Sequence, residues 1–400
     1  MNKITLFFTF AVLTSTLFSQ QGTYKLKIKT LMGHEINPLR APSNYINNNG
    51  DNLERTELWN NLPFSGVGAS LTSLSNSKRH RMDLYSSYRS SFNKNSPIKS
   101  SILEGGARFF SQGKKGRKWS SKLMYRNYVK TGGEDQDNLI GAPLSYQRFI
   151  LDNSFSFKMH KNWRMSLTPR SVFKFYKRSG YKQFRYMHHG LTTVFSYRYN
   201  LKNKAGCRLI IGAGQRNHLI QRNTANANTM TSQGNPEVFV VNGENENLNR
   251  MWRYYSAIIG SKVPLNKKMK FIMEAGYILR KDVLDEKLGY GQTQLDLGIQ
   301  YNVKKWKLSG QLSHLGRNYA TLSASGSQNK LRYDYLKARG NAVFVFSKHF
   351  SAFVQVGCTS RISNSDIRAN KALRSYFIGE GTIGVNYTLQ GKYHANKRIR

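Results

Sequence analysis

The chain has 400 residues, of which 62 are Lys or Arg and 21 are Asp or Glu, so its formal net charge is +41 and its pI is about 10.3. Such an excess of cations is typical of proteins that meet polyanions, namely nucleic acid, lipopolysaccharide or acidic membranes. No zinc-finger, RNP or helix-turn-helix pattern is present, so no nucleic-acid partner is predicted. Only two cysteines exist, Cys207 and Cys358, and their separation argues against a disulfide-rich scaffold.

The first residues have the pattern of an export signal. Lys3 precedes an apolar run from Ile4 to Phe18, and the small residue Ser19 follows it. This is the order of a secretory signal peptide, and the run is shorter than the roughly 20 residues that a membrane-spanning helix needs. We therefore predict that residues 1–19 are cleaved and that the chain is exported to become an integral outer-membrane protein.

Alternation with a period of two dominates the region from residue 64 to 389. The odd positions of Gln292–Val303 are mostly apolar and the even positions are polar or small. The odd positions of Met269–Leu279 are apolar in the same way, opposite Lys270 and Glu274. Each such segment has about 10–15 residues, a length that suits a strand crossing a membrane at a tilt.

The connections between these segments alternate between short and long. Short, basic turns occur at 113–118, 160–162, 201–204, 264–268, 303–305 and 347–349. Longer, more polar connections occur at 131–145, 221–249, 281–289, 320–330 and 363–373. Short periplasmic turns with longer external loops are the arrangement of a transmembrane β-barrel, whereas a soluble β-sandwich has no reason to sort its loops by length.

Three tryptophans support the same fold. Trp119, Trp163 and Trp306 each follow a short turn directly, and Trp163 and Trp306 share the parity of the apolar residues that come after them. Aromatic residues at one depth on the outward face of a barrel form an interfacial girdle. We predict that these three residues belong to such a girdle.

The predicted fold is all-β, a transmembrane antiparallel up-and-down β-barrel of 14–16 strands. About 15 strands can be counted between residues 64 and 389, and single-chain bacterial barrels have an even number. Segment Tyr24–Met32 alternates as well, and its inclusion makes 16 the preferred count. The domain plan is a signal peptide at 1–19, an N-terminal segment at 20–63 with this strand and a long loop, the barrel at 64–389, and a basic tail at 390–400.

These features resemble those of Gram-negative outer-membrane barrel proteins. The Gln20-Gln21 junction after the signal looks like the style of the Bacteroidota, and Tyr333–Gly340 resembles a strand start seen in barrels of that group. The chain is also diffusely similar to the barrel domain of surface lipoprotein assembly modifiers, although the helical repeats that usually precede that domain are absent. The resemblance is architectural, covers nearly the whole mature chain and carries over no catalytic residue.

The parity opposite the apolar face gathers many cations, which a barrel would place in its lumen. The predicted anion-facing residues are Arg89, Arg108, Lys122, Arg126, Arg164, Arg170, Lys174, Arg198, Arg208, Arg216, Lys270, Lys337 and Arg339. Rings of Arg and Lys favour anions in pores, so porin-like passage or binding of anionic solutes is the first functional prediction. The alternative is that these cations form ion pairs with the few carboxylates, or extend their charged groups toward the strand ends, without selecting a solute.

A second group of cations sits on the short turns, including Lys267, Lys268, Lys304, Lys305 and Lys348. These lysines would form a rim at the short-turn end of the barrel. The rim could bind lipopolysaccharide, other outer-membrane lipids or an acidic protein partner, or simply keep the turns hydrated. The alternative function is therefore a non-conducting barrel that acts as a partner-binding, assembly or translocation module of an outer-membrane complex.

No enzyme is predicted, although a hydrolase site at the rim stays open as a minor alternative. His188 and His189 are the conspicuous pair, but neighbouring residues of a strand point to opposite faces, so only His188 would be luminal. No nucleophile and acid can be selected to complete a triad, hence no catalytic residue is named. No His, Cys or Glu spacing typical of a metal site occurs, and no cofactor is predicted.

Overall fold

The structure is a computed structural model of the whole chain. It describes residues 22–37, 45–46, 52–53, 61–75, 79–91, 99–113, 116–131, 145–176, 185–200, 205–218, 251–283, 288–324, 328–365 and 375–393. The predicted signal peptide, the end of the basic tail at 394–400 and the connection at 221–249 lie outside these residues. Among the described residues, no helix has the length and the apolar character needed to cross a membrane.

The described residues form long strands and one small two-stranded sheet. The wall strands are β1 (Gly22–Ile36), β4 (Asn61–Ser75), β5 (His80–Ser91), β6 (Lys99–Gln112), β7 (Lys118–Thr131), β8 (Tyr146–Lys158), β9 (Trp163–Tyr176), β10 (Tyr186–Asn200), β11 (Ala205–His218), β12 (Met251–Pro264), β13 (Met269–Asp282), β14 (Tyr290–Val303), β15 (Trp306–Ser323), β16 (Lys330–Val345), β17 (Phe350–Ser363) and β18 (Tyr376–Tyr393). The small sheet pairs β2 (Tyr45–Ile46) with β3 (Asn52–Leu53).

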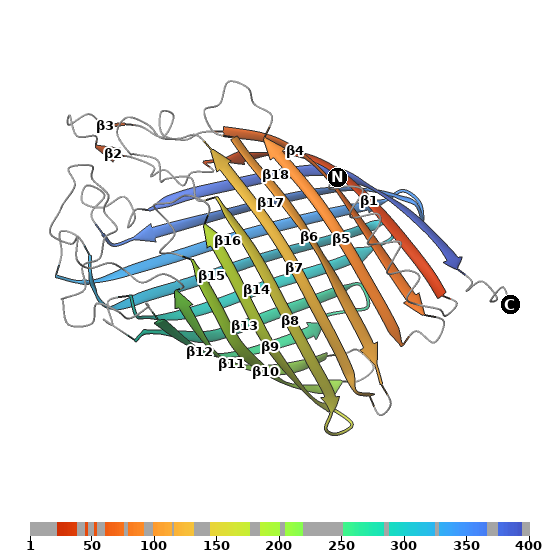
Figure 1. Cartoon of the computed structure of the whole chain (residues 1–400), viewed down its shortest axis with the longest axis horizontal. Helices are drawn as coiled ribbons and strands as arrows, with labels where there is room; N and C mark the ends of the chain where they lie inside the picture. Colours follow the sequence, from red (N-terminus) through yellow and green to blue (C-terminus); the bar gives the residue numbers. More distant parts are fainter. Residues whose placement is uncertain are drawn as a thin grey trace.

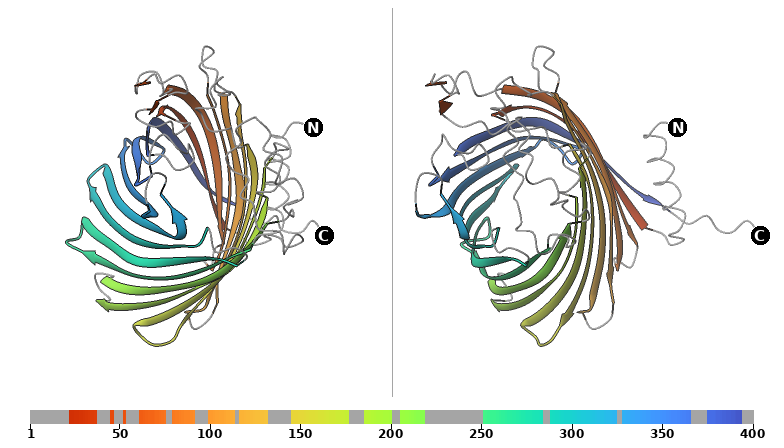
Figure 2. Two further views of the ribbon diagram at one scale, coloured as in Figure 1. Left: turned by 90° about the vertical axis from the view of Figure 1, so that its left-hand side faces the viewer. Right: turned by 60° about the vertical axis from the view of Figure 1, so that its left-hand side comes forward.

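The wall is a closed antiparallel barrel in which each strand pairs with its neighbours in the chain (Figure 1). Closure comes from β1, which pairs with β4 on one side and with β18 on the other, in register from Gly22 opposite Tyr393 to Ile36 opposite Gly379. Figure 2 shows the resulting ring of tilted strands. The predicted 16-stranded up-and-down barrel is confirmed, and its decisive first strand, Tyr24–Met32, lies within β1.

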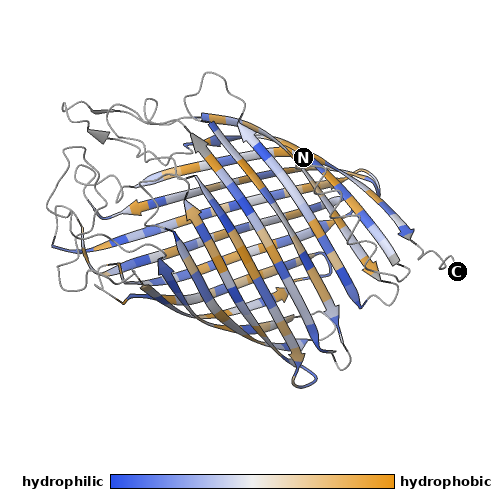
Figure 3. Ribbon diagram, in the orientation of Figure 1, coloured by the Kyte–Doolittle hydropathy of each residue, from blue (hydrophilic) through white to orange (hydrophobic). Residues whose placement is uncertain are grey.

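The alternation of the sequence becomes the two faces of the wall. Along β14, Leu295 and Ile299 expose large parts of their side chains, whereas Gln294 and Asp296 turn to the other side. Apolar residues at odd or even positions form orange bands across successive strands in Figure 3. An exposed apolar surface of this extent is stable only against lipid, because in water it would associate with other copies. The barrel is therefore a transmembrane one, with the lumen on its inward face.

The three predicted girdle tryptophans lie on the outward face at the ends of their strands. Each contacts one further ring of a neighbouring strand, and the ring centroids are 4.8–5.2 Å apart. These pairs are Trp119 with Phe109, Trp163 with Tyr197, and Trp306 with Phe344. Phe350 is also exposed on this face, at the start of β17 beside Tyr387. Their common position at the short-turn end agrees with an interfacial level.

The two-residue turn between β14 and β15 contains a strained residue. Lys304 has a φ of 46°, a backbone conformation that glycine adopts with less cost than residues with a Cβ. We expect Lys304→Gly to raise the free energy of unfolding by about 0.5–1 kcal/mol, measured by urea unfolding in detergent micelles. The control is Lys305→Gly, which removes the same charge at a residue with negative φ and should give no gain. An equal gain in both variants would attribute the effect to charge.

Candidate functional site

The inward face of the wall holds all of the cations that were predicted to face the lumen. The cross-strand register shows that these residues share one face of the wall. Arg108 stands opposite Lys122 on one side and Asp83 on the other, and Lys122 stands opposite Asp152. Arg198 is inward by the alternation of β10, just where the register with β11 shifts. Eight of the wall strands contribute these side chains, with one to three from each, and only every second residue of a strand can point inward.

Several of the inward cations are neutralised by carboxylates on neighbouring strands. Asp152 lies 3.3 Å from the guanidinium of Arg170. Arg126 is paired with Glu104 of β6 in the same way, whereas Arg208 of β11 reaches past Gly260 of β12 to Glu274 of β13. These ion pairs follow the cross-strand register, since Glu104 is opposite Arg126 and Asp152 is opposite Arg170. Several of the predicted inward cations are therefore balanced locally.

Arg89 carries the most extended of these ion pairs. Its guanidinium lies 3.0 Å from Glu35 of β1 and 2.7 Å from Glu380 of β18. It also covers the ring of Phe64 of β4, at 3.8 Å from the ring centroid. One side chain of β5 therefore bridges the three strands at which the barrel closes.

A belt of cations stacked on aromatic rings lines the end of the lumen where the long connections begin. Guanidinium and ammonium groups lie over Tyr and Trp rings at 4.1–5.2 Å, a geometry that stabilises a cation by its attraction to the ring face. The belt consists of Lys174 over Tyr146 and Tyr176, Arg216 over Tyr186, Trp252 and Tyr254, Arg280 over Trp252 and Tyr290, Arg317 over Tyr290, and Arg361 over Tyr333 and Tyr376.

The predicted residue set missed part of this belt. Arg317 and Arg361 were not among the predicted inward cations, although each lies on the inward parity of its strand. The alternation of the sequence was enough to place Arg317 on the inward face, because Arg317 shares the parity of Lys307 in the same strand. The contacts of these arginines with aromatic rings could not be predicted from the sequence, since they depend on which strands are neighbours.

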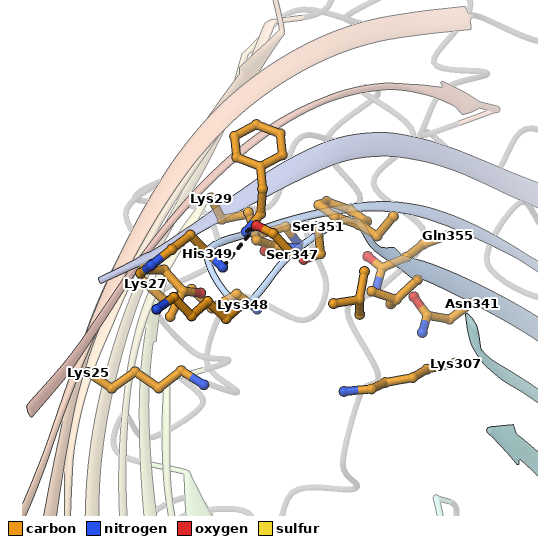
Figure 4. A pocket seen from close by; sticks show the side chains of 16 residues that line it. Lys25, Lys27, Lys29, Lys307, Asn341, Ser347, Lys348, His349, Ser351 and Gln355 are labelled. Atoms are coloured by element: carbon orange, nitrogen blue, oxygen red, sulfur yellow. Dashed lines mark hydrogen bonds between the residues drawn. The ribbon is translucent and has the colours of Figure 1, made fainter. Parts of the chain in front are cut away.

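At the opposite end, a lysine pocket opens toward the lumen (Figure 4). We define it by Lys25, Lys27 and Lys29 of β1, Lys307 of β15 and Lys348 of the turn between β16 and β17. The cavity has a volume of about 460 Å³, and its lining contains no Asp or Glu. Lys348 was predicted to belong to the rim of short-turn cations, whereas no role was predicted for the three lysines of β1.

The lysine ammonium groups of β1 repel one another. Side chains two residues apart on a strand are separated by about 6.6 Å. Two unit charges at that distance repel by about 0.6 kcal/mol in bulk water and by about 2.5 kcal/mol at an effective dielectric constant of about 20. One contact offsets part of this repulsion, because the Lys29 ammonium lies over the ring of Phe353, at 4.2 Å from its centroid. A bound anion would relieve the rest.

A second cavity, of about 700 Å³, lies beside the lysine pocket in the central lumen. Its lining joins strands from both sides of the barrel, including Arg208 of β11, Asp296 of β14, Arg339 of β16 and Glu380 of β18. Asp296 accepts a hydrogen bond from Ser313 rather than pairing with a cation. The central lumen thus contains both signs of charge, whereas the lysine pocket contains one.

The histidine pair is divided between the two faces, as the alternation predicts. His188 points inward and its ring lies 5.3 Å from that of Tyr254. His189 is on the outward face, where its Nδ1 lies 2.9 Å from the hydroxyl of Ser171. The two imidazoles therefore cannot act in one site. In the part of the chain that the structure describes, no three His, Cys, Asp or Glu residues gather as metal ligands, and Cys207 and Cys358 are free.

No family model and no curated protein matches this sequence. Solved structures with a similar fold include the outer membrane channel DcaP of Acinetobacter baumannii (TM-score 0.45, 9% identity, 93% of this chain and 98% of that chain). OpdQ of Pseudomonas aeruginosa (0.44, 9%, 92% and 99%) and an anion-selective porin from Comamonas acidovorans (0.38, 9%, 92% and 100%) are further examples. At these scores nothing about their solutes carries over. The Bacteroidota style and the likeness to assembly modifiers stay predictions.

Proposed function

We propose that the protein is an outer-membrane barrel whose basic lumen passes or binds anionic solutes. The supporting observation is the imbalance of charge on the inward face of the described strands. Inward cations without an ion pair among the described residues include Lys25, Lys27, Arg108, Lys122, Lys262, Lys270, Lys307 and Arg339. Most of the inward carboxylates are already engaged by arginines, so they cannot neutralise this set.

The position of these charges increases their effect on solutes. The wall is a low-dielectric layer, so field lines from inward charges are concentrated in the water of the lumen. An anion that enters is attracted wherever these unpaired cations face the lumen, and a cation is repelled there. An outer-membrane location supports this role, because closed barrels are the strand-built structures that can satisfy their backbone hydrogen bonds in lipid.

Ion selectivity in planar bilayers tests the proposal. With a KCl gradient across the membrane, we expect a reversal potential that indicates preference for chloride. The double variant Lys262→Glu and Lys270→Glu should lower the chloride-to-potassium permeability ratio several-fold, since both side chains point into the lumen. The control is the double variant Lys304→Glu and Lys305→Glu, which changes the same charge on the turn and should shift the ratio much less.

Two results would contradict this function. A cation-selective conductance of the natural chain would contradict the basic lumen. Absence of conductance, together with a protein that co-purifies in stoichiometric amount, would instead support the partner-binding or assembly module. The lysines of the short turns are where an acidic partner or anionic lipid headgroups would bind in that case.

A further inference from the structure

We propose that the lysine pocket is a binding site for multivalent oxyanions of the phosphate class. The inference deepens the proposed function and rests on it in one respect, since the solute reaches the pocket through the lumen. The pocket differs from the rest of the lumen because its charge is of one sign, and its cations come from strands that are distant in sequence.

The lysines approach the same space from two sides of the cavity. Lys25, Lys27 and Lys29 occupy successive inward positions of β1, where they are paired with Gln390, Thr388 and Asn386 of β18. Lys307 of β15 points toward Lys25 from across the pocket, and Lys348 of the turn between β16 and β17 lines the same cavity near Lys27 (Figure 4). Strands β1 and β15 are separated in the wall by β18, β17 and β16, so the curvature of the barrel brings these lysines to one cavity.

The short-turn ends of the strands that form this pocket carry no carboxylate. Residues 1–34, 297–333, 335–365 and 381–400 include neither Asp nor Glu, and together they supply the short-turn ends of β1 and of β15 to β18. The first carboxylates toward the other end, Glu35 and Glu380, are both engaged by Arg89. Among the described residues, no ion pair involves a lysine of the pocket.

The kind of cation indicates the kind of ligand. Arginine offers a planar fork that suits a single carboxylate or phosphate, whereas lysine is a compact point charge that acts from any direction. An all-lysine pocket whose β1 lysines are attached to the backbone at steps of about 6.6 Å therefore fits an anion whose charge is spread over several groups. The amides of Asn341, Gln355 and Asn386 add hydrogen-bond donors to the lining. A monovalent anion would engage only a fraction of these cations.

Calorimetric titration of the purified barrel in a non-ionic detergent, with pyrophosphate as the probe, tests the site without a membrane. We expect saturable binding of pyrophosphate and weaker binding of inorganic phosphate at equal ionic strength. The triple variant Lys25→Gln, Lys27→Gln and Lys29→Gln should weaken pyrophosphate binding by about tenfold or more, since each lysine makes a charged hydrogen bond. The matched control is Lys267→Gln, Lys268→Gln and Lys304→Gln on the rim, which should bind as the natural chain does.

Two further variants keep the test informative if the triple variant fails to fold. Lys307→Gln removes one pocket cation from a different strand and should weaken binding in the same direction, and the triple replacement of the β1 lysines by arginine should retain binding. No saturable heat with the natural chain, or equal loss in the pocket and rim variants, would overturn the site. Anion-selective conductance without pyrophosphate binding would contradict the site alone, and binding without conductance would contradict the pore alone.

Discussion

An arginine in place of Ile299 is expected to lower the free energy of unfolding of the barrel by about 2–4 kcal/mol. Ile299 lies on the outward face of β14 and exposes 43% of its surface. It is four residues from Val303, which is paired with Trp306 of the girdle, so it stands about 10 Å inside the apolar band. That band is about 25 Å tall, so a guanidinium there would be near its middle, where it is most costly.

The neighbouring residue provides the control for this prediction. Gln300 is also exposed but points into the lumen, so Gln300→Arg keeps its charge in water and should cost less than about 1 kcal/mol. Reversible unfolding in urea, with refolding into lipid vesicles, measures both variants. Equal destabilisation at the two positions would contradict the assignment of the faces and with it the transmembrane barrel.

Removal of the Arg89 side chain is expected to cost about 1–3 kcal/mol of stability. Arg89→Met leaves Glu35 and Glu380, which face each other across the β1–β18 register, without their common cation. The penalty exceeds that of an ordinary surface pair because the guanidinium is only 20% exposed and two carboxylates then repel each other. It is lower than for a fully buried pair because Glu380 is 43% exposed.

Two variants distinguish this effect from loss of a side chain in general. Arg81→Met removes a more exposed arginine whose partner is the single carboxylate Asp83, and it should cost less than about 1 kcal/mol. Adding Glu35→Gln and Glu380→Gln to Arg89→Met should recover most of the lost stability, since the uncompensated charges disappear. The free energy of unfolding in urea measures all three. Failure of the double glutamine change to recover stability would show that Arg89 acts through its packing on Phe64 instead.

The inward or outward direction of each side chain was predictable from the sequence, because the period of a strand is two and is purely local. That property led to the barrel, to the faces of β14 and to the separation of His188 from His189. The number of strands depended on one weak segment at Tyr24–Met32, since a short alternating run in isolation does not show whether it has partners. Its pairing with β4 and β18 makes it part of the wall.

The sequence by itself determined the fold class, the parity of each strand residue and the different lengths of the connections at the two barrel ends. Only the tertiary structure decided which charges meet. Arg89 and Glu380 are 291 residues apart, and the lysine pocket joins β1 with β15 and with the turn after β16. Such contacts depend on barrel closure and on the cross-strand register, which follow from the pairing of whole strands. Parity places a charge on the inward face, whereas neutralisation depends on neighbours that are distant in the chain.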